Sequence, residues 1–81
     1  MVLQDIRGYA AAGRWAMTAH ARRRAAERGV RPEDVRHALT TASTCSEQGD
    51  GSWKVPSQDT AGDDLTTIVM LEDGVLVVTL F

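Results

Sequence analysis

The chain has 81 residues, of which 43% are hydrophobic and 25% charged, and its formal net charge is −2. This balance is typical of one small globular domain and excludes a disordered chain, because enough apolar side chains are present to form a core. The single cysteine excludes a disulfide within the chain, and with two distant histidines it does not make a zinc site. No apolar run approaches the roughly 20 residues that a membrane span needs. The N-terminus has no signal-peptide pattern, so we expect a cytoplasmic protein without metal or cofactor.

Charge is divided unevenly between the two halves of the chain. Residues 1–40 hold eight arginines and four carboxylates, whereas residues 41–81 hold one lysine and seven carboxylates. The eight arginines are Arg7, Arg14, Arg22, Arg23, Arg24, Arg28, Arg31 and Arg36. The asymmetry indicates either a surface that faces an anion or two solvated surfaces of opposite charge.

Three helices are predicted in the first half. Apolar side chains at helical spacing predict the first over residues 3–12, after which Trp15 and Met17 form a short extended link anchored in the core. The second spans residues 19–28, between a capping hydroxyl at Thr18 and a left-handed C-terminal stop at Gly29. Its small residues, predicted to share one side, are Ala21, Ala25, Ala26 and Gly29. The third begins at Pro32, and its predicted buried stripe is Val35, Ala38, Leu39 and Ala42.

The second half reads as strands separated by turns. Turn signals at residues 49–51, 60–64 and 72–74 separate predicted strands over about 52–58, 65–71 and 75–81, with a weak strand before the first turn. Pro56 places its strand near a sheet edge. The last two strands are apolar on both faces. We therefore expect helices on one face of the sheet and a partner, or the remaining chain, on the other.

These elements predict one α+β domain over residues 1–81. Two to three N-terminal helices (about 1–42) pack on a C-terminal antiparallel β-meander of three to four strands (about 44–81).

The second predicted helix carries the strongest functional pattern. His20, Arg24 and Arg28 lie at positions i, i+4 and i+8, which aligns them along one helix face. Cleavage of RNA by its own 2′-hydroxyl needs a proton-transfer group and positive charge for the phosphate, and an imidazole with two guanidiniums can supply both. We assign His20 as the acid or base, and Arg24 and Arg28 as the phosphate clamp.

Other charged side chains have supporting roles in this hypothesis. Arg22, Arg23 and Arg31 add nonspecific attraction for phosphates, and Glu27 orients or neutralises an arginine. Arg22 lies nearest the alanine side and is predicted to extend around the core.

The segment from Thr18 to Val30, the helix start at Pro32 and the late hairpin resemble the domain-of-unknown-function 4258 family of small bacterial proteins. The matching positions are Thr18, His20, Arg24, Arg28, Gly29, Val35, Val78 and Thr79. The order of helices and strands is also similar to the RelE-like and BrnT-like ribonuclease toxins and to a barnase-like arrangement. That similarity implies RNA lying across the sheet and the adjoining helices. Toxins of this kind commonly carry basic or tyrosine side chains on the last strands, where this chain has Val77, Thr79 and Phe81.

Structural interpretations of the same residues remain open. His20 can serve the fold by hydrogen bonding to the backbone or to the following strand. The arginines can form a solvated face in which Glu27 pairs with Arg23 or Arg31. Two further groups are assigned to structure: the tryptophans Trp15 and Trp53 to the core rather than to base stacking, and the carboxylates around Asp59 to a polar turn rather than a cation site.

Three functions follow from these alternatives. The leading hypothesis is a toxin-like RNA-binding protein, whose catalytic version is a metal-independent endoribonuclease of a toxin–antitoxin pair with an antitoxin-like partner. The alternative is a noncatalytic interaction module that binds another protein or its own copy as a homodimer. Binding of nucleic acid without cleavage is a third option, which salt-dependent affinity would distinguish.

Overall fold

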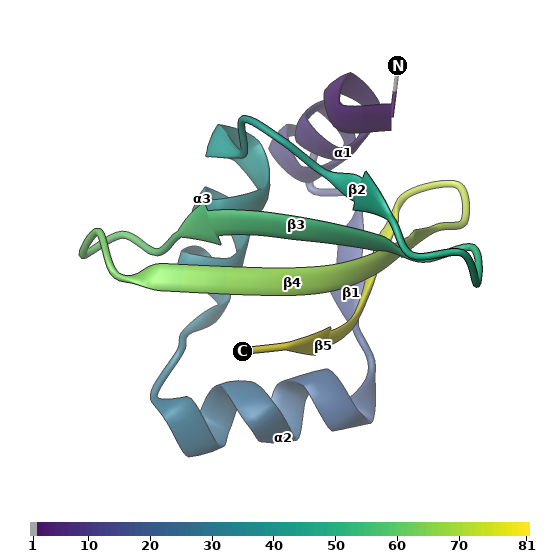
Figure 1. The fold of residues 1–81 in the computed structure, drawn as a ribbon. Helices are drawn as coiled ribbons and strands as arrows, with labels where there is room; N and C mark the ends of the chain where they lie inside the picture. Colours follow the sequence, from purple (N-terminus) through teal and green to yellow (C-terminus); the bar gives the residue numbers. More distant parts are fainter. Residues whose placement is uncertain (1) are drawn as a thin grey trace.

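The computed structural model describes residues 2–81, which form an α+β fold of three helices and a five-stranded sheet (Figure 1). The elements in chain order are α1 (Val2–Ala11), β1 (Trp15–Met17), α2 (Ala19–Arg28), α3 (Pro32–Thr41), β2 (Ser46–Glu47), β3 (Trp53–Gln58), β4 (Asp64–Leu71) and β5 (Val75–Leu80). The predicted packing of N-terminal helices on C-terminal strands is confirmed.

The sheet is mixed, so the prediction of a purely antiparallel meander is wrong. Its strand order is β1-β5-β4-β3-β2, and β1 runs parallel to β5 while all other pairs are antiparallel. The segment Trp15–Met17, predicted to be a link, is this first strand. It supplies hydrogen-bond partners to an edge of β5 that would otherwise lack them.

The start of α2 is fixed to β5 by Thr18. The Thr18 hydroxyl accepts from the Ala21 N–H at 3.1 Å, which is the predicted cap, and donates to the Val78 carbonyl at 2.9 Å. Its backbone N–H donates to the Val77 carbonyl at 3.0 Å. Gly29 ends the helix with φ 67°, in the left-handed region as predicted. The side chains that follow Thr18 are therefore held beside the last strand (Figure 1).

The core lies between the helices and one face of the sheet. Helices α1 and α3 lie behind the sheet in the view of Figure 1, and α2 runs alongside β5. All four residues of the stripe predicted on the third helix are buried. The buried apolar side chains that the sheet contributes are Val55, Leu65, Val69, Val75, Val77 and Leu80.

The opposite face of the sheet, which we call the outer face, carries no helix among residues 2–81 (Figure 1). Its apolar side chains on β4 and β5 are half-buried: Ile68, Met70, Leu76 and Val78. The helices thus cover one face of the sheet, as expected.

A register shift in β5 decides which residues reach the outer face. Ile68 is opposite Thr79, but Val69 is opposite Val77, so Val78 is an extra residue. Leu80 is therefore fully buried, and Thr79 is on the outer face. Without the shift, strict alternation would place Thr79 inside and Leu80 outside.

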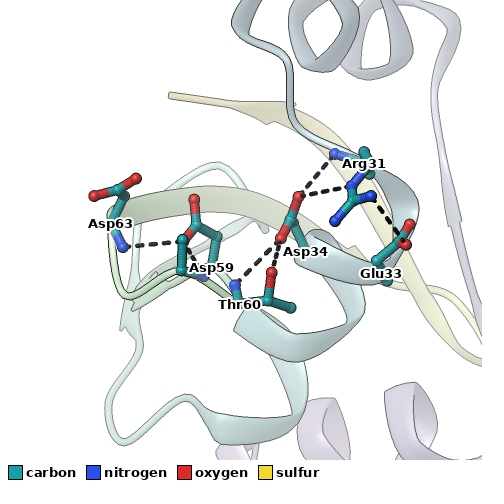
Figure 2. A network of polar contacts seen from close by, with 7 residues as sticks. Arg31, Glu33, Asp34, Asp59, Thr60 and Asp63 are labelled. Atoms are coloured by element: carbon teal, nitrogen blue, oxygen red, sulfur yellow. Dashed lines mark hydrogen bonds and ion pairs between the residues drawn. The ribbon is translucent and has the colours of Figure 1, made fainter.

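Asp34 ties the start of α3 to the loop between β3 and β4 (Figure 2). Its carboxylate, in a residue only 7% exposed, accepts from the Thr60 hydroxyl and from the backbone N–H groups of Thr60 at 3.2 Å and Arg31 at 3.0 Å. The Thr60 hydroxyl, followed by the Arg31 N–H, lowers the pKa of Asp34 below its usual value. The ionised form is thus favoured in the folded chain.

We expect the substitution Asp34→Asn to lower the free energy of unfolding near neutral pH. Because the folded-state pKa of Asp34 is lowered, its contribution is complete above the unfolded-state pKa and is lost as the pH falls through the folded-state pKa. The difference in free energy of unfolding between wild type and D34N, measured by urea unfolding, should therefore become smaller below about pH 4.

Asp63→Asn removes the same charge from the same network and is the matched control. The Asp63 carboxylate makes no hydrogen bond or ion pair among residues 2–81. Only its backbone is bonded: the N–H donates to Asp59 Oδ1 at 2.9 Å (Figure 2), and the carbonyl accepts from the Asp59 N–H at 2.8 Å. An equal loss of stability in D34N and D63N, or a D34N difference that does not vary with pH, would contradict this account.

Candidate nucleic-acid interface

His20 lies where α2 runs alongside β5, and its side chain reaches Thr79 on the outer face. Its Nε2 is 3.0 Å from the Thr79 hydroxyl oxygen, and the residue is exposed to solvent. The structural alternative for His20, a hydrogen bond to a strand, is therefore present, and the strand is the last one, β5. Nδ1 makes no hydrogen bond within the described part of the chain, so one ring nitrogen is held by the fold and the other has no partner there.

The two arginines of the predicted row follow His20 along α2. Arg24 is half-buried, and its Nε atom is buried without a hydrogen-bond partner, whereas Arg28 at the end of the helix is exposed. A buried guanidinium N–H without an acceptor has lost its contact with water.

The arginines of α2 differ from those elsewhere in their contacts. Arg7, Arg14 and Arg36 each donate to a backbone carbonyl, and Arg14 also pairs with Asp73 at 2.8 Å. By contrast, the four arginine side chains of α2 make no hydrogen bond or ion pair within residues 2–81: Arg22, Arg23, Arg24 and Arg28. The helix therefore presents positive charge that the described part of the chain does not neutralise.

Arg31 and Glu27 differ in their contacts with groups of opposite charge. Arg31 lies beside the carboxylates of Glu33 at 3.8 Å and Asp34 at 4.0 Å, at the start of α3 (Figure 2). Glu27 makes no ion pair among the described residues, so its predicted pairing with Arg23 or Arg31 is wrong. Arg31 has found acidic partners nearer to it in sequence, and α2 keeps its four free cations.

The rotation of α2 also differs from the helical-wheel prediction. Ala21 and Ala25 are buried as predicted, but Ala26 and Gly29 are exposed, and it is Arg24 rather than Arg22 that is half-buried. The bonds of Thr18 and His20 to β5 fix the helix in this orientation. As a result, the side of α2 that carries His20 and Arg24 is turned toward the sheet.

Three residues near the interface were not predicted to contribute to it: Thr79, Lys54 and Phe81. Thr79 bonds His20, and the ammonium of Lys54 lies 5.9 Å from the centre of the Phe81 ring. Phe81 is 46% exposed. No sequence pattern marks the register shift that turns Thr79 outward, so these contacts are visible only in the folded chain.

The remaining candidates have structural roles. Trp15 and Trp53 are half-buried and pack against the core, as predicted. Asp59 accepts from the N–H groups of Ala61 and Asp63, both at 2.9 Å, which is the predicted polar turn (Figure 2). The described range, residues 2–81, contains no cluster of three metal-ligating side chains.

Comparisons with protein-family models, with curated proteins and with solved structures find no match to this chain. None of the helices described here is long and apolar enough to cross a membrane. Indications of function therefore come from the geometry of α2 and the outer face.

Proposed function

We propose that this protein binds RNA on the face of α2 that carries His20, Arg24 and Arg28, and cleaves it as a toxin-like endoribonuclease. The observation that carries the proposal is that four arginines of one helix lack internal partners while an exposed imidazole lies on the same helix. Phosphates are the ligands that such an array favours, because guanidinium groups bind phosphate oxygens with paired, charge-assisted hydrogen bonds.

The chemistry proposed for the site needs no metal. His20 takes the proton of a ribose 2′-hydroxyl, the 2′-oxygen bonds to the adjacent phosphorus, and the bond from phosphorus to the 5′-oxygen breaks. Water supplies the proton that the leaving 5′-oxygen requires. Arg24 and Arg28 stabilise the negative charge on the phosphate in the transition state. The products are a 2′,3′-cyclic phosphate and a 5′-hydroxyl end.

In this proposal Thr79 is a positioning residue. Its hydroxyl fixes one nitrogen of the imidazole and so sets the direction of the other. The ribonuclease part of the proposal draws on the sequence resemblance to RelE-like and BrnT-like toxins, which is an analogy of element order and which no family model or solved structure matches. A cytoplasmic toxin of this kind would have an antitoxin-like protein as its partner.

The binding part of the proposal is tested by removing charge from two places on the molecule. We expect the double variant R24Q/R28Q to bind a short single-stranded RNA more weakly than wild type. The slope of the logarithm of the binding constant against the logarithm of salt concentration should decrease in magnitude by about 1.4, since each of the two lost phosphate contacts contributes about 0.7 on a single strand. Fluorescence anisotropy at several salt concentrations measures both quantities.

R7Q/R36Q is the matched control, because it removes the same charge from arginines that already donate to the carbonyls of Thr40 and Ala11. We expect its slope to equal that of wild type. Equal slopes for both double variants would mean that α2 does not contact phosphates, and the proposal would fail.

A second candidate function is supported by the outer face. This half-buried apolar surface, which includes Ile68, Met70 and Leu76, carries no helix in the described part of the chain and could bind a protein partner or a second copy without catalysis. It predicts a stable complex or dimer in light scattering that L76E disrupts and His20→Ala leaves unchanged. A monomer at all concentrations, with no complex, would count against it.

A further inference from the structure

Phe81 is the one large hydrophobic side chain of residues 2–81 that is exposed, with 46% of its surface accessible. Its backbone is nevertheless held in place. The Phe81 N–H donates to the Thr66 carbonyl at 2.9 Å, and the Phe81 carbonyl accepts from the Thr66 N–H at 2.8 Å. The ring is thus attached to an ordered extension of the sheet.

A cation lies beside this ring. Lys54, on β3, is opposite Ile68 of β4, and its ammonium reaches to 5.9 Å from the Phe81 ring centre. The ammonium lies over the ring, so a base that stacks on this face takes the place of Lys54. Such a pair suits a nucleotide, because the displaced cation can then contact a phosphate.

The ring is also close to the proposed catalytic group along the strand. Thr79, which bonds His20, and Phe81 are two residues apart, which is about 7 Å in an extended chain. A nucleotide whose base lies on Phe81 therefore places its own or a neighbouring phosphate near His20. Helix α2, which carries Arg24 and Arg28, runs alongside β5 (Figure 1).

From these contacts we infer that the site takes single-stranded RNA, with an unpaired base stacked on Phe81 and Lys54 contacting the backbone of the same strand. This inference rests on the proposed function and narrows it to one class of RNA. Bases in a duplex are stacked on one another and cannot lie on a protein ring, whereas unpaired bases can.

The test compares single-stranded and duplex RNA of equal length, each binding to wild type, F81A and F81W. We expect F81A to lose roughly 5- to 150-fold in affinity for the single strand, as expected for one base stack, and to bind the duplex as wild type does. F81W should restore the single-strand affinity. A 2-aminopurine base in the single strand should lose fluorescence on binding to wild type and F81W but not to F81A.

The outcomes separate this inference from the proposed function. One outcome would overturn the stacking site and leave the α2 interface intact. In it, RNA binding depends on α2, wild type binds single strand and duplex equally, and F81A binds both as wild type does. No binding of either RNA would overturn both. Self-association that F81A abolishes, without RNA binding, would assign the ring to a protein contact instead. Thermal unfolding of each variant verifies that the fold is retained.

Discussion

Replacing His20 with alanine is expected to lower the rate of RNA cleavage by about 10²- to 10⁴-fold, the usual range for loss of a general acid or base. Binding should change much less, because the phosphate contacts of Arg24 and Arg28 remain. Single-turnover cleavage of a labelled RNA gives the rate, and anisotropy gives the affinity. The 3′ end of the product should be a 2′,3′-cyclic phosphate.

Two controls make this result specific. His37→Ala removes the other histidine, on α3, and should cleave at the wild-type rate. A substrate with deoxyribose at the cleavage position lacks the attacking hydroxyl and should remain intact with every variant. Cleavage by H20A at the wild-type rate, or cleavage of the deoxy substrate, would rule out the proposed chemistry.

Leu80→Ala is expected to destabilise the fold by about 2–5 kcal/mol, the range for removing a fully buried leucine side chain. Thr79→Val, one residue earlier, should change stability by less than about 1 kcal/mol, because Thr79 lies on the outer face. The order of the two variants should be reversed for the rate of cleavage, with the larger direct effect at Thr79. Thr79→Val should slow cleavage by removing the hydroxyl that holds His20, and Thr79→Ser should restore it.

This pair of variants tests the register shift that forms the interface. If β5 alternated without the extra residue, Thr79 would be buried and Leu80 exposed. Urea unfolding that shows a larger loss of stability for T79V than for L80A would contradict the shift, and with it the position of Thr79 beside His20.

Local signals in the sequence were sufficient to predict most of the helices. As predicted, α2 begins after the capping hydroxyl of Thr18 and ends before the left-handed Gly29, so it spans residues 19–28. Both signals act within one turn of the helix. Strand β1 was missed as a strand. Its three residues carry no hairpin signal, and they form a strand only by pairing with β5, which lies 60 residues later in the chain.

The candidate site could be predicted in part for the same physical reason. The spacing of His20, Arg24 and Arg28 within one helix is visible in the sequence, since helical periodicity is local. Their neighbours depend on contacts between distant segments. The His20–Thr79 bond and the Lys54–Phe81 contact both follow from the pairing of β3, β4 and β5, including a shift that strict alternation does not reveal.

The most direct test is to titrate nitrogen-15-labelled protein with a short single-stranded RNA and follow backbone and side-chain NMR signals. The account predicts that the largest shifts fall on α2 and the end of β5, at His20, Arg24, Arg28 and Thr79. The signals of Arg7 and Arg36, on α1 and α3, should hardly move. Shifts confined to α1 and α3, or none at RNA concentrations well above those of the protein, would contradict it.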